Sequence, residues 1–317
     1  MKELKEDIKN KTFSPIYLLF GIDYLKRHYK KMFIKSFEKE EVSILENAEI
    51  KDIKQIANAI SFFGTKRLII VKNSGFFDKK NSEELQQFFS TTPSNTIIFI
   101  EDKVDKRTKF FKTIQKIGKI CEFTQLSESD MNTWLCQIAK RRGKELKPSM
   151  ASYLVKVVGN DMNILENELE KLLAYSGKVI NQKDINEACI ASIESKIFTM
   201  LKAVSERNTQ LVLKEYKILI EDKEEPIKIL IMVARQIRLM LRAKALSGAG
   251  LSNDAIAKRM QIMTFAVREY LKNSTNFKYK DLMNAISECS ILDCKIKQGE
   301  VNAEIGLELF LTKLTLK

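Results

Sequence analysis

The chain has 317 residues, of which 44 % are hydrophobic, and its 54 basic and 41 acidic residues give a formal net charge of +13. This length favours two or three domains, and the apolar fraction allows a sizeable core. No apolar run approaches the roughly 20 residues of a transmembrane helix, and the charged residues 1–11 lack the apolar centre of a signal peptide. We therefore expect a cytoplasmic protein without membrane contact.

The charge and the cysteines leave the class of partner open. A basic surface attracts nucleic acid through counterion release, but many lysine-rich proteins have no such partner. The five cysteines form no CxxC pair, and His28 is the single histidine. These residues do not support a metal site, and we expect reduced thiols with a structural role.

The first third of the chain alternates between short apolar runs and helical segments. The runs with strand length are 16–20, 42–45, 68–71, 97–100 and 120–123. The segments with helical character between them are 23–33, 52–62, 82–89 and 108–117. Near-continuous apolar strands separated by helices predict a parallel sheet that is buried on both faces.

The rest of the chain reads as helical throughout. Ser127 followed by Asp130 resembles a capping box and predicts a helix that begins after residue 127. The further predicted helices are 147–158, 161–175, 183–189, 195–205, 208–221, 225–247, 252–259, 264–274, 278–293 and 300–315. We expect three domains: an α/β domain at 1–127, a small helical domain at 128–193 and a second helical domain at 194–317.

The order strand, Gly21, helix is how a P-loop nucleotide-binding domain begins. A working P-loop needs the pattern GxxxxGK[ST], in which backbone amides surround the phosphates and the lysine reaches the β- and γ-phosphates. Here bulky residues follow Gly21, among them Tyr24 and Leu25, and Lys26 is not followed by serine or threonine. The sequence therefore predicts a nucleotide-binding fold that does not hold a nucleotide.

The acidic pair that a P-loop ATPase places after a core strand is also missing from its expected position. The third strand ends in Lys72 and Asn73. Glu101 and Asp102 follow the fourth strand and resemble such a pair, but without a lysine cradle we expect them to be solvated turn residues. The single histidine and the absence of HExxH and GxSxG patterns leave no candidate catalytic residue and no cofactor.

An aromatic pair at Phe62 and Phe63 follows the predicted helix 52–62. At about 100° per residue, Phe63 falls on the apolar side of that helix, whereas Phe62 points the opposite way. An exposed phenylalanine before Gly64 suits an anchor for the pocket of a partner. The alternative is that Phe62 packs under the following loop or against the next domain. For the second pair, Phe76 and Phe77, packing is the favoured interpretation.

Together these features resemble the delta subunit family of the bacterial DNA polymerase III clamp loader, over essentially the whole chain. The segments that carry the resemblance are 15–21, 62–73, 95–100 with Lys106 and Arg107, 159–161 with Leu165, 167–169 and 171–172, and 293–299. No single one of these motifs is diagnostic, but their order and spacing over the full length are specific.

The resemblance implies a degenerate AAA+ α/β domain, a helical lid and a helical collar. Such a subunit binds the beta sliding clamp and opens its ring without binding ATP or catalysing a reaction. Its partners are the clamp, the gamma/tau and delta-prime subunits and, through the complex, primer–template DNA. The clamp-binding element of the family corresponds to Ser61, Phe62 and Phe63, although phenylalanine at the first apolar position departs from the more common leucine.

A basic stripe in the second helical domain is a candidate for contact with DNA or with neighbouring collar domains. It consists of Lys228, Arg235, Arg238 and Arg242, which share one face of the predicted helix 225–247. A solvated helix face explains the stripe equally well. Two other functions stay open at this point, a stand-alone basic nucleic-acid-binding protein and an active AAA+ ATPase.

Overall fold

The computed structural model describes residues 2–58, 66–77, 89 and 95–316. The chain forms two compact units, Met1–Gln125 and Leu126–Lys317. The second unit contains both predicted helical domains, so the boundary between 193 and 194 stays a prediction.

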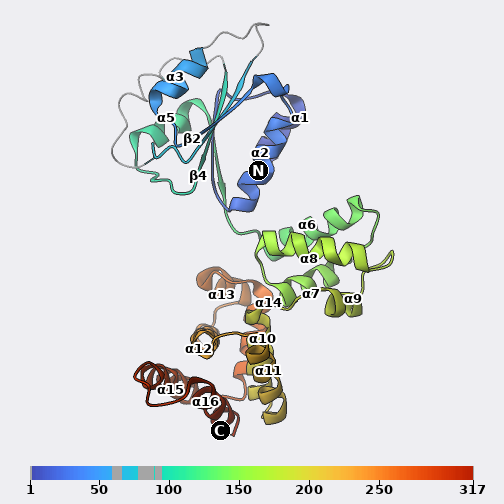
Figure 1. Cartoon of the computed structure of the whole chain (residues 1–317), viewed down its shortest axis with the longest axis vertical. Coiled ribbons are helices and arrows are strands. Elements are labelled where there is room, and N and C mark those ends of the chain that lie inside the picture. The colour runs from blue at the N-terminus through green and yellow to red at the C-terminus, as the bar shows by residue number, and fades with distance from the viewer. Residues whose placement is uncertain (1, 59–65, 78–88, 90–94, 317) are drawn as a thin grey trace. The chain divides into compact units, whose positions relative to one another are not determined.

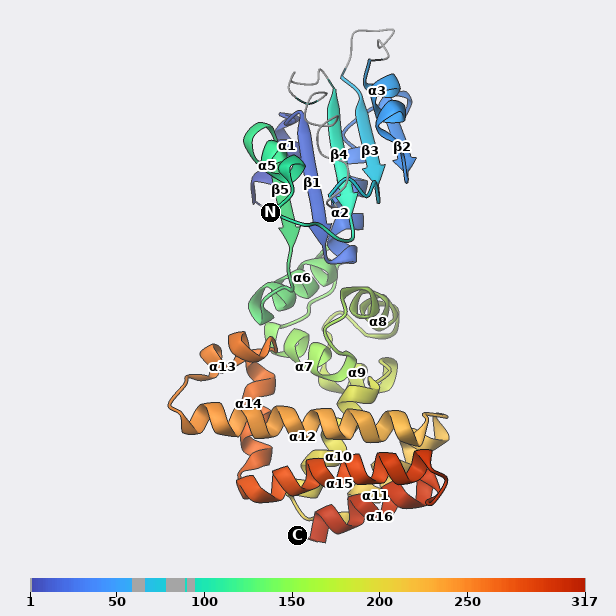
Figure 2. The same cartoon turned by 90° about the vertical axis from the view of Figure 1, so that its left-hand side faces the viewer.

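The first unit is built on a five-stranded sheet in which all neighbouring strands are parallel. Its strands are β1 (Ile16–Gly21), β2 (Val42–Glu46), β3 (Leu68–Lys72), β4 (Thr96–Glu101) and β5 (Lys119–Phe123). Their order across the sheet is β2-β3-β4-β1-β5, which places β2 and β5 at the two edges (Figure 2). Each predicted strand is present within one or two residues of its expected bounds.

Helices cover both faces of this sheet because its central strands are apolar on both sides. Figure 1 shows α3 (Ile50–Asn58) and α5 (Lys109–Ile117) on one face, and α1 (Lys2–Asn10) and α2 (Asp23–Ile34) on the other. On the face of α3 and α5, Phe99 lies at the centre of an aromatic cluster, and its ring contacts are Phe76, Phe77, Phe89 and Phe110. The predicted packing role of Phe76 and Phe77 is confirmed, since both are buried.

Helix α1 was not expected from the sequence, which shows only a short, charged segment there. Its docking depends on one apolar and one acidic side chain. Leu4 is buried, and Asp7 accepts hydrogen bonds from the Tyr17 hydroxyl (2.8 Å) and the Lys119 ammonium (2.7 Å). These two bonds attach the helix to β1 and β5.

The second unit consists of helices among the residues described. They are α6 (Glu128–Arg141), α7 (Pro148–Val158), α8 (Met162–Tyr175), α9 (Gln182–Ala188), α10 (Ile193–Ser205), α11 (Thr209–Glu221), α12 (Pro226–Gly248), α13 (Asn253–Met260), α14 (Thr264–Ser274), α15 (Tyr279–Lys297) and α16 (Ala303–Leu316). Ser127 caps α6 as predicted, because its side chain accepts the Asp130 amide. The helices from α10 onward share one hydrophobic core.

The predicted fold class is confirmed: a parallel α/β domain is followed by a helical unit, whose described residues include one isolated β-bridge between Glu145 and Val179. In the described part of the chain, no helix has the length and apolar character that crossing a membrane requires.

Candidate functional site

The turn between β1 and α2 lies where a nucleotide-binding domain would hold phosphate. A phosphate-binding loop leaves its backbone amides free at the start of the helix. Here the turn is short, and the Ile22 amide donates to the Phe123 carbonyl of β5 at 2.9 Å. Gly21 has a φ of +103°, and a Cβ at this position would lie 2.2 Å from the same carbonyl oxygen. The backbone of β5 therefore excludes a side chain at position 21 and takes up the Ile22 amide, so this amide does not face a phosphate group.

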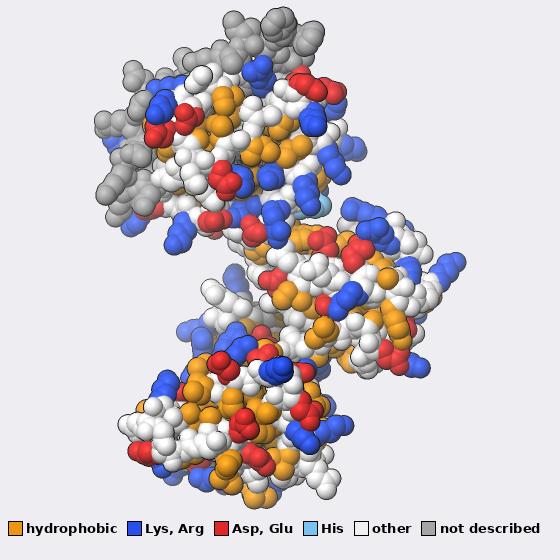
Figure 3. All heavy atoms as spheres, in the orientation of Figure 1, with side chains coloured by type: hydrophobic (Ala, Val, Ile, Leu, Met, Phe, Trp, Pro, Cys, Tyr) orange, Lys and Arg blue, Asp and Glu red, His pale blue; other side chains and the backbone are white. Residues whose placement is uncertain are grey.

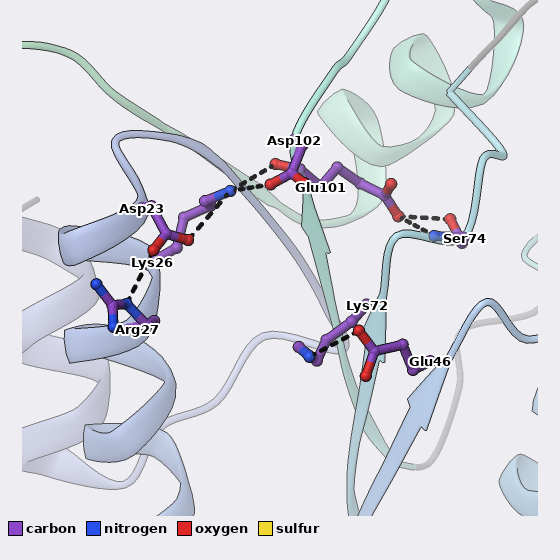
Figure 4. A network of polar contacts seen from close by, with 8 residues as sticks. All are labelled: Asp23, Lys26, Arg27, Glu46, Lys72, Ser74, Glu101 and Asp102. Atoms are coloured by element: carbon purple, nitrogen blue, oxygen red, sulfur yellow. Dashed lines mark hydrogen bonds and ion pairs between the residues drawn. The ribbon is translucent and has the colours of Figure 1, made fainter.

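Lys26, the lysine nearest to this turn, is neutralised within the domain (Figure 4). Its side chain is buried and its ammonium group forms an ion pair with Asp102, which follows β4. The same group lies 3.4 Å from the Glu101 carbonyl oxygen and 3.8 Å from the carboxylate of Asp23. A buried ammonium with three such oxygen neighbours stabilises the junction between α2 and β4 instead of holding a phosphate.

Glu101 differs from the sequence-based expectation, whereas Asp102 agrees with it. Asp102 has an exposed side chain, as a turn residue should. The expectation was wrong for Glu101, which is only 3 % exposed and accepts hydrogen bonds from the Ser74 amide and hydroxyl. Burial raises the pKa of the Glu101 carboxyl group, and the bonds from Ser74 oppose that shift. The Glu101 carboxylate is hydrogen-bonded to Ser74 in the loop after β3, so it is not positioned as a magnesium ligand.

Glu101→Gln is expected to preserve the fold and to flatten the pH dependence of its stability. A carboxyl group whose pKa is raised by folding contributes stability below its unfolded pKa and loses that contribution as the pH rises through the folded value. The glutamine variant lacks this titration, while its carbonyl oxygen can still accept the Ser74 amide. Urea unfolding between pH 4 and pH 8 measures the difference, and an unchanged pH profile would contradict the burial argument.

A second basic cluster follows β4 and consists of Lys103, Lys106, Arg107 and Lys109. Two of its members form ion pairs within the domain. Lys106 forms an ion pair with Glu122 at 2.6 Å, and Arg107 forms one with Asp105 at 2.9 Å. These contacts indicate an ordinary surface. No group of three or more His, Cys, Asp and Glu residues suited to a metal ion occurs within the described ranges.

The predicted clamp-binding residues Ser61, Phe62 and Phe63 lie outside the described residues. The chain on either side of them is held by one buried side chain, that of Asn95. Its Nδ2 donates to the Ala57 carbonyl near the end of α3 at 2.9 Å, and its Oδ1 accepts the Arg67 amide just before β3 at 3.0 Å. A single amide group therefore joins the two ends of the connection that contains the aromatic pair.

The bridging role of Asn95 was not predicted from the sequence. Asn95 begins the segment 95–100 that carries the family resemblance, and its local signal is a polar residue immediately before the apolar strand β4. Such a residue often belongs to a turn, so a contact with residues 28 and 38 positions earlier is a tertiary property.

The four residues of the basic stripe are all exposed on α12. Two of them form ion pairs: Lys228 pairs with Glu224 at 2.7 Å, and Arg235 pairs with Glu194 at 2.8 Å. No ion pair is present for Arg238 or Arg242 in the part of the chain that the structure describes. The predicted common face is compatible with these positions, but contact with DNA stays a prediction.

Comparison with known proteins agrees with this arrangement. The family model for the delta subunit of DNA polymerase III matches residues 24–124, and the model for the C-terminal domain of that subunit matches residues 194–314. A further model, described as a middle domain, matches residues 127–187. The two delta models together cover more than half of the chain.

Whole-chain relatives carry the same description. DNA polymerase III subunit delta of Bacillus subtilis is 25 % identical over 331 aligned positions, which cover 98 % of this chain and 95 % of that protein. A probable DNA polymerase III subunit delta of Aquifex aeolicus is 21 % identical and covers 88 % and 85 %. The solved structure of the Bacillus subtilis DNA clamp loader delta protein has the same fold, with a TM-score of 0.70, 23 % identity and coverage of 100 % and 99 %. The chain therefore belongs to the family of DNA polymerase III delta subunits.

Proposed function

We propose that this protein is the clamp-loader delta subunit that binds the beta sliding clamp through Ser61, Phe62 and Phe63 and opens its ring. The observation that carries the proposal is membership of the DNA polymerase III delta subunit family, and the amide bridge of Asn95 beside the proposed binding residues supports it. An anchor for a partner's pocket has to be held in position before binding, because ordering a loose segment on binding lowers affinity. Asn95 supplies such support at both ends of the segment with the aromatic pair.

Ring opening needs no chemistry in this subunit. An anchor that binds the open form of the clamp more tightly than the closed form shifts the equilibrium by the difference in binding free energy. The blocked turn at Gly21 and the neutralised Lys26 support a subunit that does not bind ATP. The gamma/tau subunits would supply ATP binding, and delta-prime would complete the complex.

DNA contact through α12 is a weaker part of the proposal. Arg238 and Arg242 are exposed and carry no ion pair among the described residues, so they suit contacts with phosphate groups of primer–template DNA in the complex. A stand-alone nucleic-acid-binding protein is the alternative function. It requires tight DNA binding by the isolated chain together with no affinity for a sliding clamp.

The direct test is calorimetric titration of the full-length chain with the sliding clamp of the same organism, alongside titrations with ATP–Mg²⁺ and with primer–template DNA. The proposal expects clamp binding without ATP binding. ATP binding by the isolated chain would instead indicate an active AAA+ ATPase. Tight DNA binding without clamp binding would favour the stand-alone alternative.

Replacing Asn95 with alanine is expected to weaken clamp binding about tenfold while the domain stays folded. The variant loses both hydrogen bonds by which Asn95 links Ala57 to Arg67. Ordering the segment between them on binding then costs more conformational entropy. Thr108→Ala is a matched control, because it removes a helix-capping bond in the same domain. Thr108 follows the carboxyl end of β4, whereas Asn95 precedes its amino end. Equal clamp affinity in the two variants would show that Asn95 has only a general stabilising role.

A further inference from the structure

A cavity of about 190 Å³ lies within the helical unit, lined by residues of α7, α10, α12 and α14 (Figure 2). The turn that joins α13 to α14 contributes to the same lining. An apolar cavity of roughly 150 Å³ is large enough to hold a benzene ring. The cavity in the helical unit therefore has room for a single ring with a small substituent.

Part of the cavity wall is apolar and aromatic. Phe198 on α10 and Tyr270 on α14 both line the cavity, and their rings meet edge to face with centroids 5.3 Å apart. Leu239 and Ala266 add aliphatic surface. Phe198, Leu239 and Ala266 are only partly buried, so this wall leaves apolar surface open to a ligand. Ring surfaces of this kind pack well against another flat ring.

A buried glutamine forms the polar part of the wall. Gln236 on α12 is only 1 % exposed. The Tyr270 hydroxyl donates a hydrogen bond to Gln236 Oε1, and Gln236 Nε2 donates one to Glu194 Oε1 at 3.0 Å. Burial raises the pKa of the Tyr270 hydroxyl above its ordinary value, so this group stays protonated and remains a donor. The two bonds together fix the orientation of the Gln236 amide.

The residues around Gln236 keep unused hydrogen-bonding capacity. Arg235 and Gln236 both donate to Glu194 Oε1, whereas no hydrogen bond to Glu194 Oε2 occurs within the described ranges. The second hydrogen on Gln236 Nε2 has no acceptor among the residues described either. A free acceptor beside a free donor matches a ligand in which an N–H group stands next to a carbonyl oxygen, as in a primary amide.

The charges around the cavity cancel. Lys156 pairs with Glu269 at 3.1 Å, Arg235 pairs with Glu194 at 2.8 Å, and all four residues line the cavity. Figure 3 shows basic and acidic side chains intermixed over the surface of the helical unit. A charged ligand would lose its hydration here without meeting an unpaired opposite charge. The cavity therefore favours a neutral ligand over a carboxylate or a nucleotide.

We propose that this cavity binds a small, neutral aromatic carboxamide, with its ring against Phe198 and Tyr270 and its amide group against Glu194 and Gln236. The amide nitrogen would donate to Glu194 Oε2, and the carbonyl oxygen would accept from Gln236 Nε2. The lining comes from α7 on one side and from α10, α12 and α14 on the other. A bound ligand would contact both groups of helices and stabilise their packing. The proposal is independent of clamp binding.

The first experiment is an NMR titration of the full-length chain with benzamide. Saturable binding is expected, with a Kd of about 1 mM for a ligand of this size. Benzoate has nearly the same shape but carries a negative charge, and it is expected to bind at least about tenfold more weakly. Absence of saturable benzamide binding would overturn the proposal, and so would equal affinity for benzoate.

Two variants test the location of the site. Ala266→Phe fills the cavity and Glu194→Ala removes the acceptor, and each is expected to weaken benzamide binding at least about tenfold. Ala255→Phe is the matched control, because it adds the same ring to an exposed alanine of α13 that does not line the cavity. Circular dichroism checks that each variant is folded. If Ala266→Phe and Glu194→Ala bound benzamide as tightly as the control, the proposed site would be wrong.

Discussion

Replacing both Phe62 and Phe63 with alanine is expected to lower the affinity for the sliding clamp by about 100-fold or more. Buried aromatic anchors contribute most of the binding free energy of small interfaces, and losing two at once removes both the apolar contact and the shape that fills the pocket. Isothermal titration of the clamp into the full-length variant measures the loss. Ser61→Ala should have a smaller effect, because a hydroxyl group at the edge of an interface contributes less.

The control for this experiment is a second pair of exposed apolar residues. Tyr279 is 53 % exposed and Met283 is 45 % exposed, both on α15. Their replacement with alanine should leave clamp affinity within about twofold of wild type. If the Phe62/Phe63 variant binds the clamp as tightly as this control, the site lies elsewhere in the chain.

Replacing Gly21 with alanine is expected to destabilise the α/β domain by about 3 kcal/mol or more. Two costs act together. The φ of +103° is unfavourable for any residue with a side chain, which costs about 1–3 kcal/mol, and the new methyl group would lie 2.2 Å from the Phe123 carbonyl oxygen. Relieving such an overlap with backbone shifts costs about 1–3 kcal/mol more. Urea denaturation followed by circular dichroism measures the change.

Gly75→Ala separates the two costs. This glycine also has a positive φ, of +71°, but nothing lies within 4 Å of the place where its Cβ would be. The variant therefore carries backbone strain alone, about 1 kcal/mol. If the two variants lost equal stability, the close contact between Gly21 and β5 would not restrain the turn.

The architecture of this protein was largely predictable because its strands are short apolar runs in a parallel sheet. Runs such as 68–71 and 97–100 are buried on both faces, so they consist of consecutive apolar residues over the length of a strand. Helices with strong stop signals were also predictable: Pro226 begins α12, which ends at Gly248. Helix α1 was missed because its apolar pattern is limited to Leu4 and Ile8, one turn apart in a short segment of charged residues.

The failures concern polar residues whose surroundings come from distant parts of the chain. Glu101 looked like a solvated turn residue, yet Ser74 after the neighbouring strand holds it in a buried position. The residues next to Lys26 in the sequence indicated that it is not a phosphate ligand. Its ion pair with Asp102 depends on the tertiary fold and could not be predicted. The proposed clamp-binding residues themselves lie outside the described residues, so that site still rests on family resemblance and on the bridge formed by Asn95.

The closed turn at Gly21 has a thermodynamic consequence for a machine that runs on ATP. A protein that binds a ligand only in its folded state gains stability with ligand concentration, and its preferred conformation follows ligand occupancy. In this domain the Ile22 amide and the Lys26 ammonium already have their partners within the chain. The stability of the proposed subunit would then not depend directly on nucleotide concentration, and any change in its conformation during the nucleotide cycle would have to come from contacts with its neighbours.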